Sequence, residues 1–231
     1  METAALLRYQ PTFAGKEMLD VGVGTGRTSI YLHPLCTRYE GIDYSPVMVQ
    51  HMRQMNPGIS VRLADMRELA DFPQGCFDFV FAPNNVLDAV GHVDRLRTLN
   101  EFHRVLRPHG TLMFSAHNRA YESALSGPHM AYSRNPVHQS VLLAEFLRRW
   151  INHRRVKSLR VQTPEYALLN DAGHDYACLH YYIGQLDQRQ QLAAVGYEVG
   201  DVLDESGRSL DAGETAVDSA HLMYVAQAVP H

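Results

Sequence analysis

The chain has 231 residues, of which 45% are hydrophobic and 20% are charged, and its formal net charge is −4. This length and composition favour a single α/β domain with a full hydrophobic core, and they exclude a largely disordered chain. Because the charge is only mildly negative, the chain has no overall attraction to nucleic acid or to an anionic membrane. We therefore expect neither as a partner.

The sequence also carries signals about compartment. It has no apolar run of membrane-spanning length, and its N-terminus lacks the basic start of a signal peptide. The three cysteines, Cys36, Cys76 and Cys178, are widely spaced and form no CxxC pair, so they indicate neither a disulfide framework nor a thiolate metal site. We therefore expect reduced thiols and a cytoplasmic protein that is a monomer or a homodimer.

Thirteen histidines raise the question of a metal site. The tightest group, from His174 to His180, lacks the i, i+4 spacing of helical ligands and a third ligand nearby. The sequence therefore predicts no resident metal ion.

The first predicted elements are a short helix over 6–13 and an apolar strand over 17–21. This strand runs into a turn with glycine at every second position, at Gly22, Gly24 and Gly26. Glycines this close together let the backbone approach a ligand, and the amphipathic residues that follow predict a helix opening over it. The alternative is a tight strand-to-helix connection that holds no ligand.

The spacing of these glycines separates two classes of nucleotide-binding protein. A dinucleotide fingerprint is G-x-G-x-x-G, whereas here the third glycine comes one residue early and Arg27 takes the sixth position. The segment from Asp20 to Gly26 instead resembles motif I of the class I S-adenosylmethionine (SAM) dependent methyltransferases, (D/E)-x-G-x-G-x-G. The resemblance implies SAM as cofactor, with Asp20 and the three glycines in its binding site.

A second predicted strand, over 39–43, ends in Asp43, nineteen residues past the second glycine of the loop. An acid at the end of the second strand of a doubly wound sheet is placed to accept hydrogen bonds from both ribose hydroxyls. The alternative is a helix N-cap, a role that Ser45 supplies equally well. The segment is similar to the region after motif I in the family, which implies that Tyr44 and Met48 also belong to the cofactor site.

A third short strand, over 61–66, closes on Asp65 and resembles the adenine-binding motif of the family. The resemblance implies that the Asp65 carboxylate accepts from the adenine amino group and that the backbone amide of Met66 meets a ring nitrogen. The alternative is that Asp65 only caps a helical turn over 66–70.

A continuous apolar run predicts the fourth strand, over 77–82, and is typical of a strand buried in a parallel sheet. Small and amide side chains follow, among them Asn84 and Asn85. In the family, the residues beyond this strand line the methionine end of the cofactor and face the methyl acceptor, so the resemblance places both asparagines there. An asparagine pair after a proline is also ordinary loop sequence.

The remaining elements complete a Rossmann-like α/β fold. Apolar residues at helical spacing predict a helix over 93–106, and a fifth strand follows over 111–117. A helix over 187–195 and strands over 196–203 and 221–228 close the chain. The resemblance implies a seven-stranded, mostly parallel sheet in the order 3-2-1-4-5-7-6, with an antiparallel last strand and helices on both faces.

Residues 118–186 interrupt the alternation of strand and helix, with a helix predicted over 139–155. Insertions at the carboxyl ends of parallel strands lie over the ligand edge, so we expect this one to cap the substrate within one domain that spans 1–231. The candidates for substrate contact are Asn118, Tyr121, Trp150, His180 and Tyr181. The alternative for each aromatic side chain is a packed, hydrogen-bonded place in the core.

Methyl transfer from a sulfonium is an in-line displacement, so the protein mainly aligns the reactants and excludes water. A strong base is not obligatory, but an acidic heterocyclic N–H or a phenol must lose its proton. We assign orientation or proton removal to His117, His92 or Tyr9. Tyr9 is also counted with the cofactor residues.

The predicted function is SAM-dependent methylation of a small, planar heteroaromatic or phenolic metabolite, since the chain resembles bacterial small-molecule methyltransferases of secondary metabolism. N-methylation is favoured, with an azapteridine of the toxoflavin type as the narrowest hypothesis. The alternatives are a SAM-binding sensor without catalysis, an O-methyltransferase of another natural product, and a nucleotide-sugar or NAD-dependent oxidoreductase.

Overall fold

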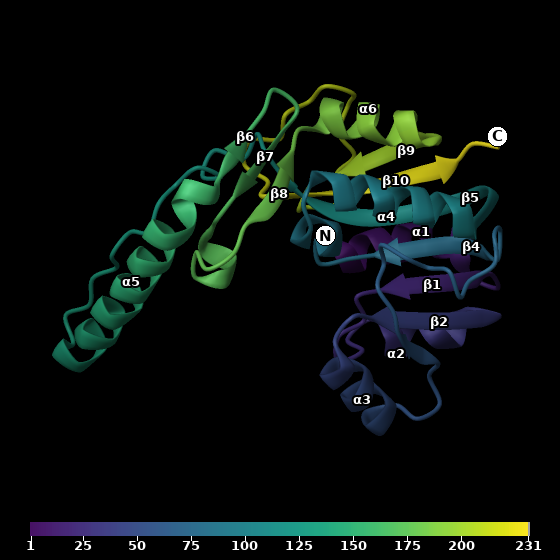
Figure 1. The fold of residues 1–231 in the computed structure, drawn as a ribbon, viewed down its shortest axis with the longest axis horizontal. Coiled ribbons are helices and arrows are strands. Elements are labelled where there is room, and N and C mark those ends of the chain that lie inside the picture. Colours follow the sequence, from purple (N-terminus) through teal and green to yellow (C-terminus); the bar gives the residue numbers. More distant parts are fainter. Residues whose placement is uncertain (231) are drawn as a thin grey trace.

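A mixed sheet runs through the centre of the protein, and helices cover both of its faces (Figure 1). The computed structural model describes residues 1–230, and within them the sheet has ten strands. The strands are β1 (Glu17–Val21), β2 (Arg38–Asp43), β3 (Val61–Leu63), β4 (Phe77–Ala82), β5 (Leu106–Asn118), β6 (Val161–Gln162), β7 (Tyr166–Leu169), β8 (His180–Ile183), β9 (Tyr197–Leu203) and β10 (His221–Ala228). The helices are α1 (Glu2–Phe13), α2 (Ser29–Leu32), α3 (Pro46–Met55), α4 (His92–Val105), α5 (Pro136–Val156) and α6 (Gln185–Val195), with short 3₁₀ helices η1 (His33–Leu35), η2 (Val86–Ala89), η3 (Lys157–Leu159) and η4 (Ala172–His174).

The order of the main strands is β3-β2-β1-β4-β5-β10-β9. The first five are parallel, and β10 runs antiparallel to both β5 and β9. Counted without the insertion, β9 and β10 are the sixth and seventh strands. The order 3-2-1-4-5-7-6 that the family resemblance implies is therefore confirmed.

Three further strands, β6, β7 and β8, were not predicted. β8 pairs in parallel with the last two residues of β5, and β7 and β6 extend the ladder antiparallel from it. The sequence signal failed for two reasons. All four residues of β8 are buried, so it shows no alternation of polar and apolar residues, and β6 is only two residues long.

Alternation along the strands divides the core into two layers. Met18, Phe79 and Phe81 face the side covered by α1 and α2. Their strand neighbours Leu19 and Val80 face the opposite side, where α4 and α6 pack. The sheet is thus buried on both faces, as expected for parallel strands joined by helical crossovers.

Two predicted helical segments are shorter than their patterns suggested. The helix after the glycine loop, α2, has only four residues, because Pro34 lacks an amide hydrogen and cannot continue an α-helix. Residues 66–70 form turns and no helix. The helix predicted over 93–106 ends at Val105, and β5 begins directly after it, five residues before the predicted start.

α5 projects away from the sheet (Figure 1). It begins at the N-cap Asn135, whose side-chain oxygen accepts hydrogen bonds from two backbone amides, and none of its residues is buried. Residues on this helix therefore lie outside the body of the sheet. Within residues 1–230, no helix combines the length and the apolar character needed to cross a membrane.

Candidate functional site

The loop after β1 is built on three glycines in a left-handed conformation, with φ of 73° at Gly22, 54° at Gly24 and 86° at Gly26. A Cβ on Gly22 would lie 2.5 Å from Cγ1 of Val86, and one on Gly26 would collide with the sulfur of Met52. At Gly24 nothing lies within 4 Å of the added atom. The positive φ disfavours a side chain at all three positions, and the contact with Val86 adds a packing restriction at Gly22, whereas Gly24 has open space above it.

Asp43, at the end of β2, holds this loop in place. Its Oδ2 accepts from the backbone amide of Gly24 at 2.9 Å, and its Oδ1 accepts from the amide of Ser45 at 2.8 Å. The N-cap of α3 is Ser45, whose hydroxyl accepts from the amide of Met48 at 3.4 Å. Asp43 is therefore free of the capping role, and Met48 lies in the first turn of α3.

A cavity of about 420 Å³ opens beside the loop; we call it the glycine-loop cavity. Its lining is Val21, Gly22, Ile42, Asp43, Tyr44, Ala64, Asp65, Met66, Arg67, Val86, Ala89 and Val90. Five of these are predicted cofactor residues: Gly22, Asp43, Tyr44, Asp65 and Met66. Apolar walls with carboxylates at two points suit a flat base joined to a sugar.

Asp65 is engaged by Arg67, a residue that the sequence analysis did not identify. Nη2 of Arg67 lies 2.7 Å from Oδ2 of Asp65, and its Nη1 lies 2.7 Å from Oδ2 of Asp94. These hydrogen bonds from Arg67 lower the pKa of Asp65. Asp65 also accepts from the backbone amide of Arg67 at 2.9 Å, so it orders its own turn while it borders the cavity.

Asp20 has a different place from the one predicted. It is fully buried beneath the loop, where its Oδ2 accepts from the hydroxyl of Tyr39 at 2.5 Å and from that of Ser29 at 3.3 Å. Its Oδ1 has no hydrogen-bond partner within residues 1–230. Burial raises the pKa of Asp20 to about 7. Asp20 supports the loop from below, and its side chain does not reach the surface of the cavity.

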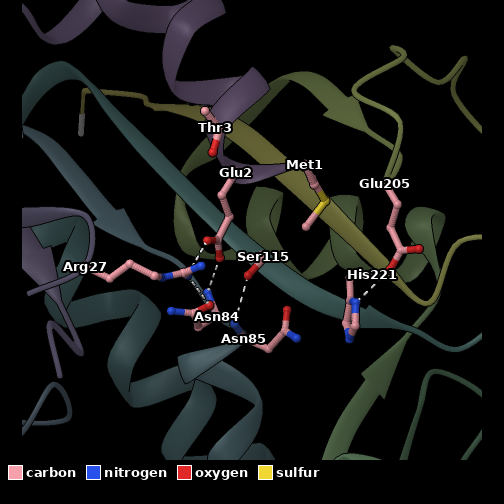
Figure 2. Close-up of a pocket in the computed structure, with 9 residues that line it drawn as sticks. All are labelled: Met1, Glu2, Thr3, Arg27, Asn84, Asn85, Ser115, Glu205 and His221. Atoms are coloured by element: carbon pink, nitrogen blue, oxygen red, sulfur yellow. Dashed lines mark hydrogen bonds and ion pairs between the residues drawn. The ribbon is translucent and has the colours of Figure 1, made fainter. Parts of the chain in front are cut away.

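A second cavity, of about 390 Å³, lies where the N-terminus meets the ends of β4 and β5; we call it the N-terminal cavity (Figure 2). It is lined by Met1, Glu2, Thr3, Arg27, Asn84, Asn85, Ser115, Glu205 and His221. Arg27 lies at its edge, with Nη2 2.7 Å from the Glu2 carboxylate and 2.8 Å from Oδ1 of Asn84. The two cavities are lined by neighbouring residues, because Asn85 lines the N-terminal cavity and Val86 lines the glycine-loop cavity.

Asn84 and Asn85 follow β4 and line the N-terminal cavity. Both are left-handed, with φ of 54° and 55°, a conformation that asparagine tolerates better than most residues. The amide of Asn85 donates to the Ser115 hydroxyl at 2.8 Å, and its Oδ1 is buried with no partner among residues 1–230. A buried acceptor beside a cavity suits a ligand that brings its own donor.

Beyond the cavities, a buried ion pair joins η2 to α4. Asp88 and Arg95 are both fully buried, and Nη1 of Arg95 lies 2.5 Å from Oδ1 of Asp88. Nη2 of Arg95 donates to Oε1 of Gln188 at 2.6 Å, and its guanidinium covers the ring of Tyr181 at 4.5 Å. This pair was not predicted, although the sequence holds a signal for it: Arg95 falls on the same helix face as the apolar Leu99.

Asp88 also holds His117 at the end of β5. Its Oδ2 lies 2.7 Å from Nδ1 of His117 and accepts from the backbone amide of the same residue at 2.6 Å. The His117 ring packs against His221, which lines the N-terminal cavity, at a centroid distance of 4.9 Å. On another side it stacks on His180 at 5.1 Å. His117 is thus one aromatic ring away from the cavity.

His92 belongs to another aromatic stack. Its Nδ1 lies 2.8 Å from the hydroxyl of Tyr181, and its ring lies flat on Tyr166 with centroids 4.3 Å apart. Burial lowers the pKa of His92 and raises that of Tyr181 to about 12. Tyr181 is fully buried and belongs to the core. This agrees with the alternative interpretation of the aromatic residues, a packed and hydrogen-bonded place.

Three further predicted site residues, like Asp20, make their contacts outside the two cavities. Tyr9 lies on α1, where its hydroxyl donates to Asp201 on β9 at 2.5 Å. Asn118 is buried, and its amide donates to three backbone carbonyls in the segment 215–219. Trp150 lies on the projecting α5, 43% exposed, with the guanidinium of Arg154 over its ring. Each has a structural partner that accounts for its polar or aromatic group.

Tyr121 and His180 lie in the insertion, as predicted. Tyr121 packs against a small core that includes Tyr182 and Leu169. Nδ1 of His180 lies 2.8 Å from Oδ2 of Asp171, which also accepts from the Tyr182 hydroxyl at 2.7 Å. Burial opposes the charge on Asp171, but these hydrogen bonds outweigh it and hold the pKa of Asp171 well below its usual range.

A parallel sheet of this order, with a glycine loop after β1 and acids after β2 and β3, defines the fold of the class I SAM-dependent methyltransferases. Residues 18–110 match the model of a family described as a methyltransferase domain. The chain is 30% identical over 107 residues to a probable SAM-dependent methyltransferase of Mycolicibacterium smegmatis, a match that covers 46% of this chain and 40% of that protein. It thus matches less than half the length of the curated relatives.

Solved structures show the same fold. A SAM-dependent methyltransferase from Mesorhizobium loti superposes with a TM-score of 0.66 at 21% identity, covering 98% of this chain and 97% of the other. The 1,6-didemethyltoxoflavin-N1-methyltransferase of Burkholderia thailandensis superposes with a TM-score of 0.61 at 14% identity, covering 99% and 77%, and was solved with S-adenosylhomocysteine bound. The predicted resemblance to class I SAM-dependent methyltransferases is confirmed, and SAM is the cofactor that these findings support.

Proposed function

We propose that this protein transfers the methyl group of SAM to a small, planar heteroaromatic or phenolic acceptor, with a ring nitrogen as the favoured site of methylation. The observation that carries the proposal is the pair His117 and Asp88, held one ring away from the N-terminal cavity. A cofactor site alone is compatible with binding without chemistry. An oriented histidine beside the adjoining cavity adds a group that can take a proton from an acceptor.

The residues present fit the cofactor. Gly22 admits no Cβ, Asp43 and Asp65 border the glycine-loop cavity, and Asn85 presents an unpartnered buried oxygen. We assign the base and sugar to the glycine-loop cavity and the amino-acid end to the side of Asn84 and Asn85. When bound, SAM supplies an electrophilic methyl group on a sulfonium, which needs alignment and exclusion of water more than acid catalysis.

The contact with Asp88 determines which nitrogen of His117 is basic. A carboxylate at 2.7 Å from Nδ1 selects the tautomer whose Nδ1–H donates to it. On this proposal Nε2, which lies 4.0 Å from Oδ2 of Asp171, is the nitrogen that takes the proton from the acceptor. The other oxygen of Asp88 accepts from Arg95. This contact fixes the carboxylate, and the carboxylate in turn fixes the imidazole of His117. Asp88 and Arg95 are positioning residues in this scheme.

The class of acceptor is inferred from the rings around His117. His180, Tyr182 and His221 all lie within about one ring of it, with centroids 5.1, 4.8 and 4.9 Å away. These aromatic faces favour a flat acceptor whose N–H or O–H is acidic. The fold shared with an enzyme of toxoflavin methylation supports an azapteridine of that type as the narrowest candidate. On this proposal residues 118–186 act as the cap of a single domain, in a cytoplasmic protein with free thiols.

The proposal is tested with SAM labelled in its methyl group. The acceptors are a planar azaheterocycle, 1,6-didemethyltoxoflavin, and a phenol of similar size, each added to purified protein. We expect label in the heterocycle and its location on a ring nitrogen by mass spectrometry. Label in the phenol alone would instead establish the O-methyltransferase alternative.

A matched pair of variants then tests the proton acceptor. His117→Phe keeps the size and flatness of the ring but removes the base, so turnover should fall at least about 100-fold while S-adenosylhomocysteine still binds. His129→Phe, at an exposed position in the insertion, should leave both unchanged. Unchanged turnover in His117→Phe removes this residue from the mechanism. A protein that binds the cofactor but labels no acceptor, even in an extract of its own host, is a sensor.

A further inference from the structure

The loop between β7 and β8 gathers three side chains that bind metals. His174, Cys178 and His180 each place one ligand atom within 4.8 Å of the other two. They occur in the order H-x-x-x-C-x-H within seven residues. The sequence alone gave no third ligand beside the two histidines. The turn of the loop brings the thiol of Cys178 to them as a candidate third ligand.

The spacing of two of the ligand atoms agrees with tetrahedral coordination. Sγ of Cys178 lies 3.5 Å from Nε2 of His180. Bond lengths of about 2.3 Å to sulfur and about 2.0 Å to nitrogen, at a tetrahedral angle, put these two atoms about 3.5 Å apart. The same distance also fits a thiol-to-imidazole hydrogen bond, so the two explanations need an experiment to separate them.

Asp171 orients one of the ligands. Its Oδ2 lies 2.8 Å from Nδ1 of His180, which leaves Nε2 of that ring directed toward Cys178. A carboxylate on the outer nitrogen of a ligating histidine is the usual support of a zinc site, because it fixes the tautomer and raises the basicity of the inner nitrogen. Tyr182 donates to the same carboxylate at 2.7 Å and fixes it in turn.

The loop is held in this shape by contacts with its surroundings. Asp175 and Tyr176 are both left-handed, with φ of 51° and 61°, and reverse the chain between His174 and Cys178. Nε of Arg149 on α5 lies 2.9 Å from Oδ1 of Asp175, and the Asn170 amide donates to the carbonyl of Tyr176 at 2.9 Å. The ligands are therefore arranged before any ion binds, which lowers the ordering cost of binding.

We propose that His174, Cys178 and His180 bind a zinc ion, with Asp171 as the carboxylate that positions His180. One thiolate and two imidazoles form a donor set that suits Zn²⁺ and disfavours Mg²⁺ and Ca²⁺, which prefer oxygen. His174 and Cys178 are exposed, so the fourth coordination position faces solvent. The rings of His180 and His117 stack, which places the ion next to the histidine that we propose as the proton acceptor.

The test uses untagged protein without SAM, so it does not depend on methyl transfer. Co²⁺ replaces Zn²⁺ and reports its ligands: tetrahedral cobalt absorbs in the visible region, and a thiolate adds a charge-transfer band in the near ultraviolet. We expect one Co²⁺ per chain with both signals, displaced by Zn²⁺. Absence of both signals in the wild-type protein would establish the hydrogen bond alone and overturn the proposal.

Variants assign the ligands. Cys178→Ser should abolish the charge-transfer band, and His174→Ala should weaken binding at least about 10-fold; both positions are exposed, so the fold should survive. Asp171→Asn should weaken binding about 10- to 100-fold while it keeps the charge-transfer band. The matched controls Cys76→Ser and His129→Ala should bind like the wild type. A band that survives Cys178→Ser, or is lost in Cys76→Ser, places the metal elsewhere and refutes the site.

Discussion

The two sides of the proposed site are built in different ways. We call the glycine-loop cavity the cofactor side, and the network of Asp88, His117 and Arg95 the acceptor side. On the cofactor side, carboxylates at strand ends bind backbone amides close by: Asp43 holds Gly24 and Ser45, and Asp65 holds Arg67. On the acceptor side, side chains hold other side chains from distant parts of the chain. Asp88 pairs with His117 across 29 positions, and Arg95 reaches Gln188 across 93.

This difference has a physical consequence. Removing a carboxylate that accepts from nearby backbone amides should disturb only that loop. Removing one member of a buried side-chain network leaves an unpaired polar group in the core, which lowers the free energy of unfolding. Single substitutions should therefore act mainly on stability on the acceptor side and mainly on ligand affinity on the cofactor side.

The largest effect is expected from Arg95→Met. The Asp88 carboxylate would stay fully buried without its counter-ion, which should lower the free energy of unfolding by about 3–5 kcal/mol. For a chain of this size the melting temperature should fall by about 10 °C, measured by calorimetry. Arg97→Met is the control on the same helix, because its pair with Glu68 is exposed and contributes less than about 1 kcal/mol. Equal melting temperatures for the two variants would show that the buried pair does not stabilise the acceptor side.

Asp20→Asn tests the buried acid beneath the glycine loop. Burial raises the pKa of Asp20 from 3.8 to about 7, so the folded protein binds more protons than the unfolded chain between these values. The stability that this group contributes is complete below about pH 4 and is lost as the pH rises to 7. The asparagine variant should therefore gain on the wild type over this range by up to about 4 kcal/mol, since one pKa unit equals about 1.4 kcal/mol.

The measurement is chemical unfolding of both proteins at several pH values from 4 to 7. The exposed Asp218→Asn serves as control and should keep a constant difference from the wild type. If Asp20→Asn also ran parallel to the wild type, Asp20 would be ionised in the folded protein, and its unpartnered oxygen would need another explanation.

Gly22→Ala tests the cofactor side. The added Cβ would collide with Val86 at a residue with φ of 73°, so the loop must move. Strain of about 3 kcal/mol in the bound conformation corresponds to about 100-fold weaker binding of S-adenosylhomocysteine, measured by titration calorimetry. Gly58→Ala is the control, since nothing lies within 4 Å of its added Cβ. Equal affinities for both variants would place the cofactor away from this loop.

Trp150→Ala should have the smallest effect. The side chain lies on the projecting α5, and its contact with Arg154 is an exposed cation–π pair with a value of less than about 1 kcal/mol. We expect no change in the KM for the methyl acceptor, measured by label transfer. A KM raised several-fold would restore Trp150 to the substrate site and show that α5 closes over it.

The sequence by itself predicted five of the residues that line the glycine-loop cavity and, through the family resemblance, the order of the main strands. Gly22, Asp43 and Asp65 were predicted because each stands at or just past the carboxyl end of a predicted strand, and parallel strands bring these ends to one edge. The place of each of these three residues depends on the strand directly before it, so the local sequence is enough to predict it. Arg67 was not predicted, because its place is defined by a pair of acids, Asp65 and Asp94, of which the second lies 27 positions away.

The tertiary structure alone decided the acceptor side. Asp88, His117 and His221 come together through the pairing of β5 with η2 and β10, and the ligands of the proposed zinc site through a loop pinned by α5. Tyr9, Asn118 and Trp150 make contacts outside the two cavities for the same reason: a residue type says what bonds a side chain makes, but only the packed chain decides which partner it meets. The partners of Tyr9 and Asn118 lie far apart in sequence, where no local period connects them.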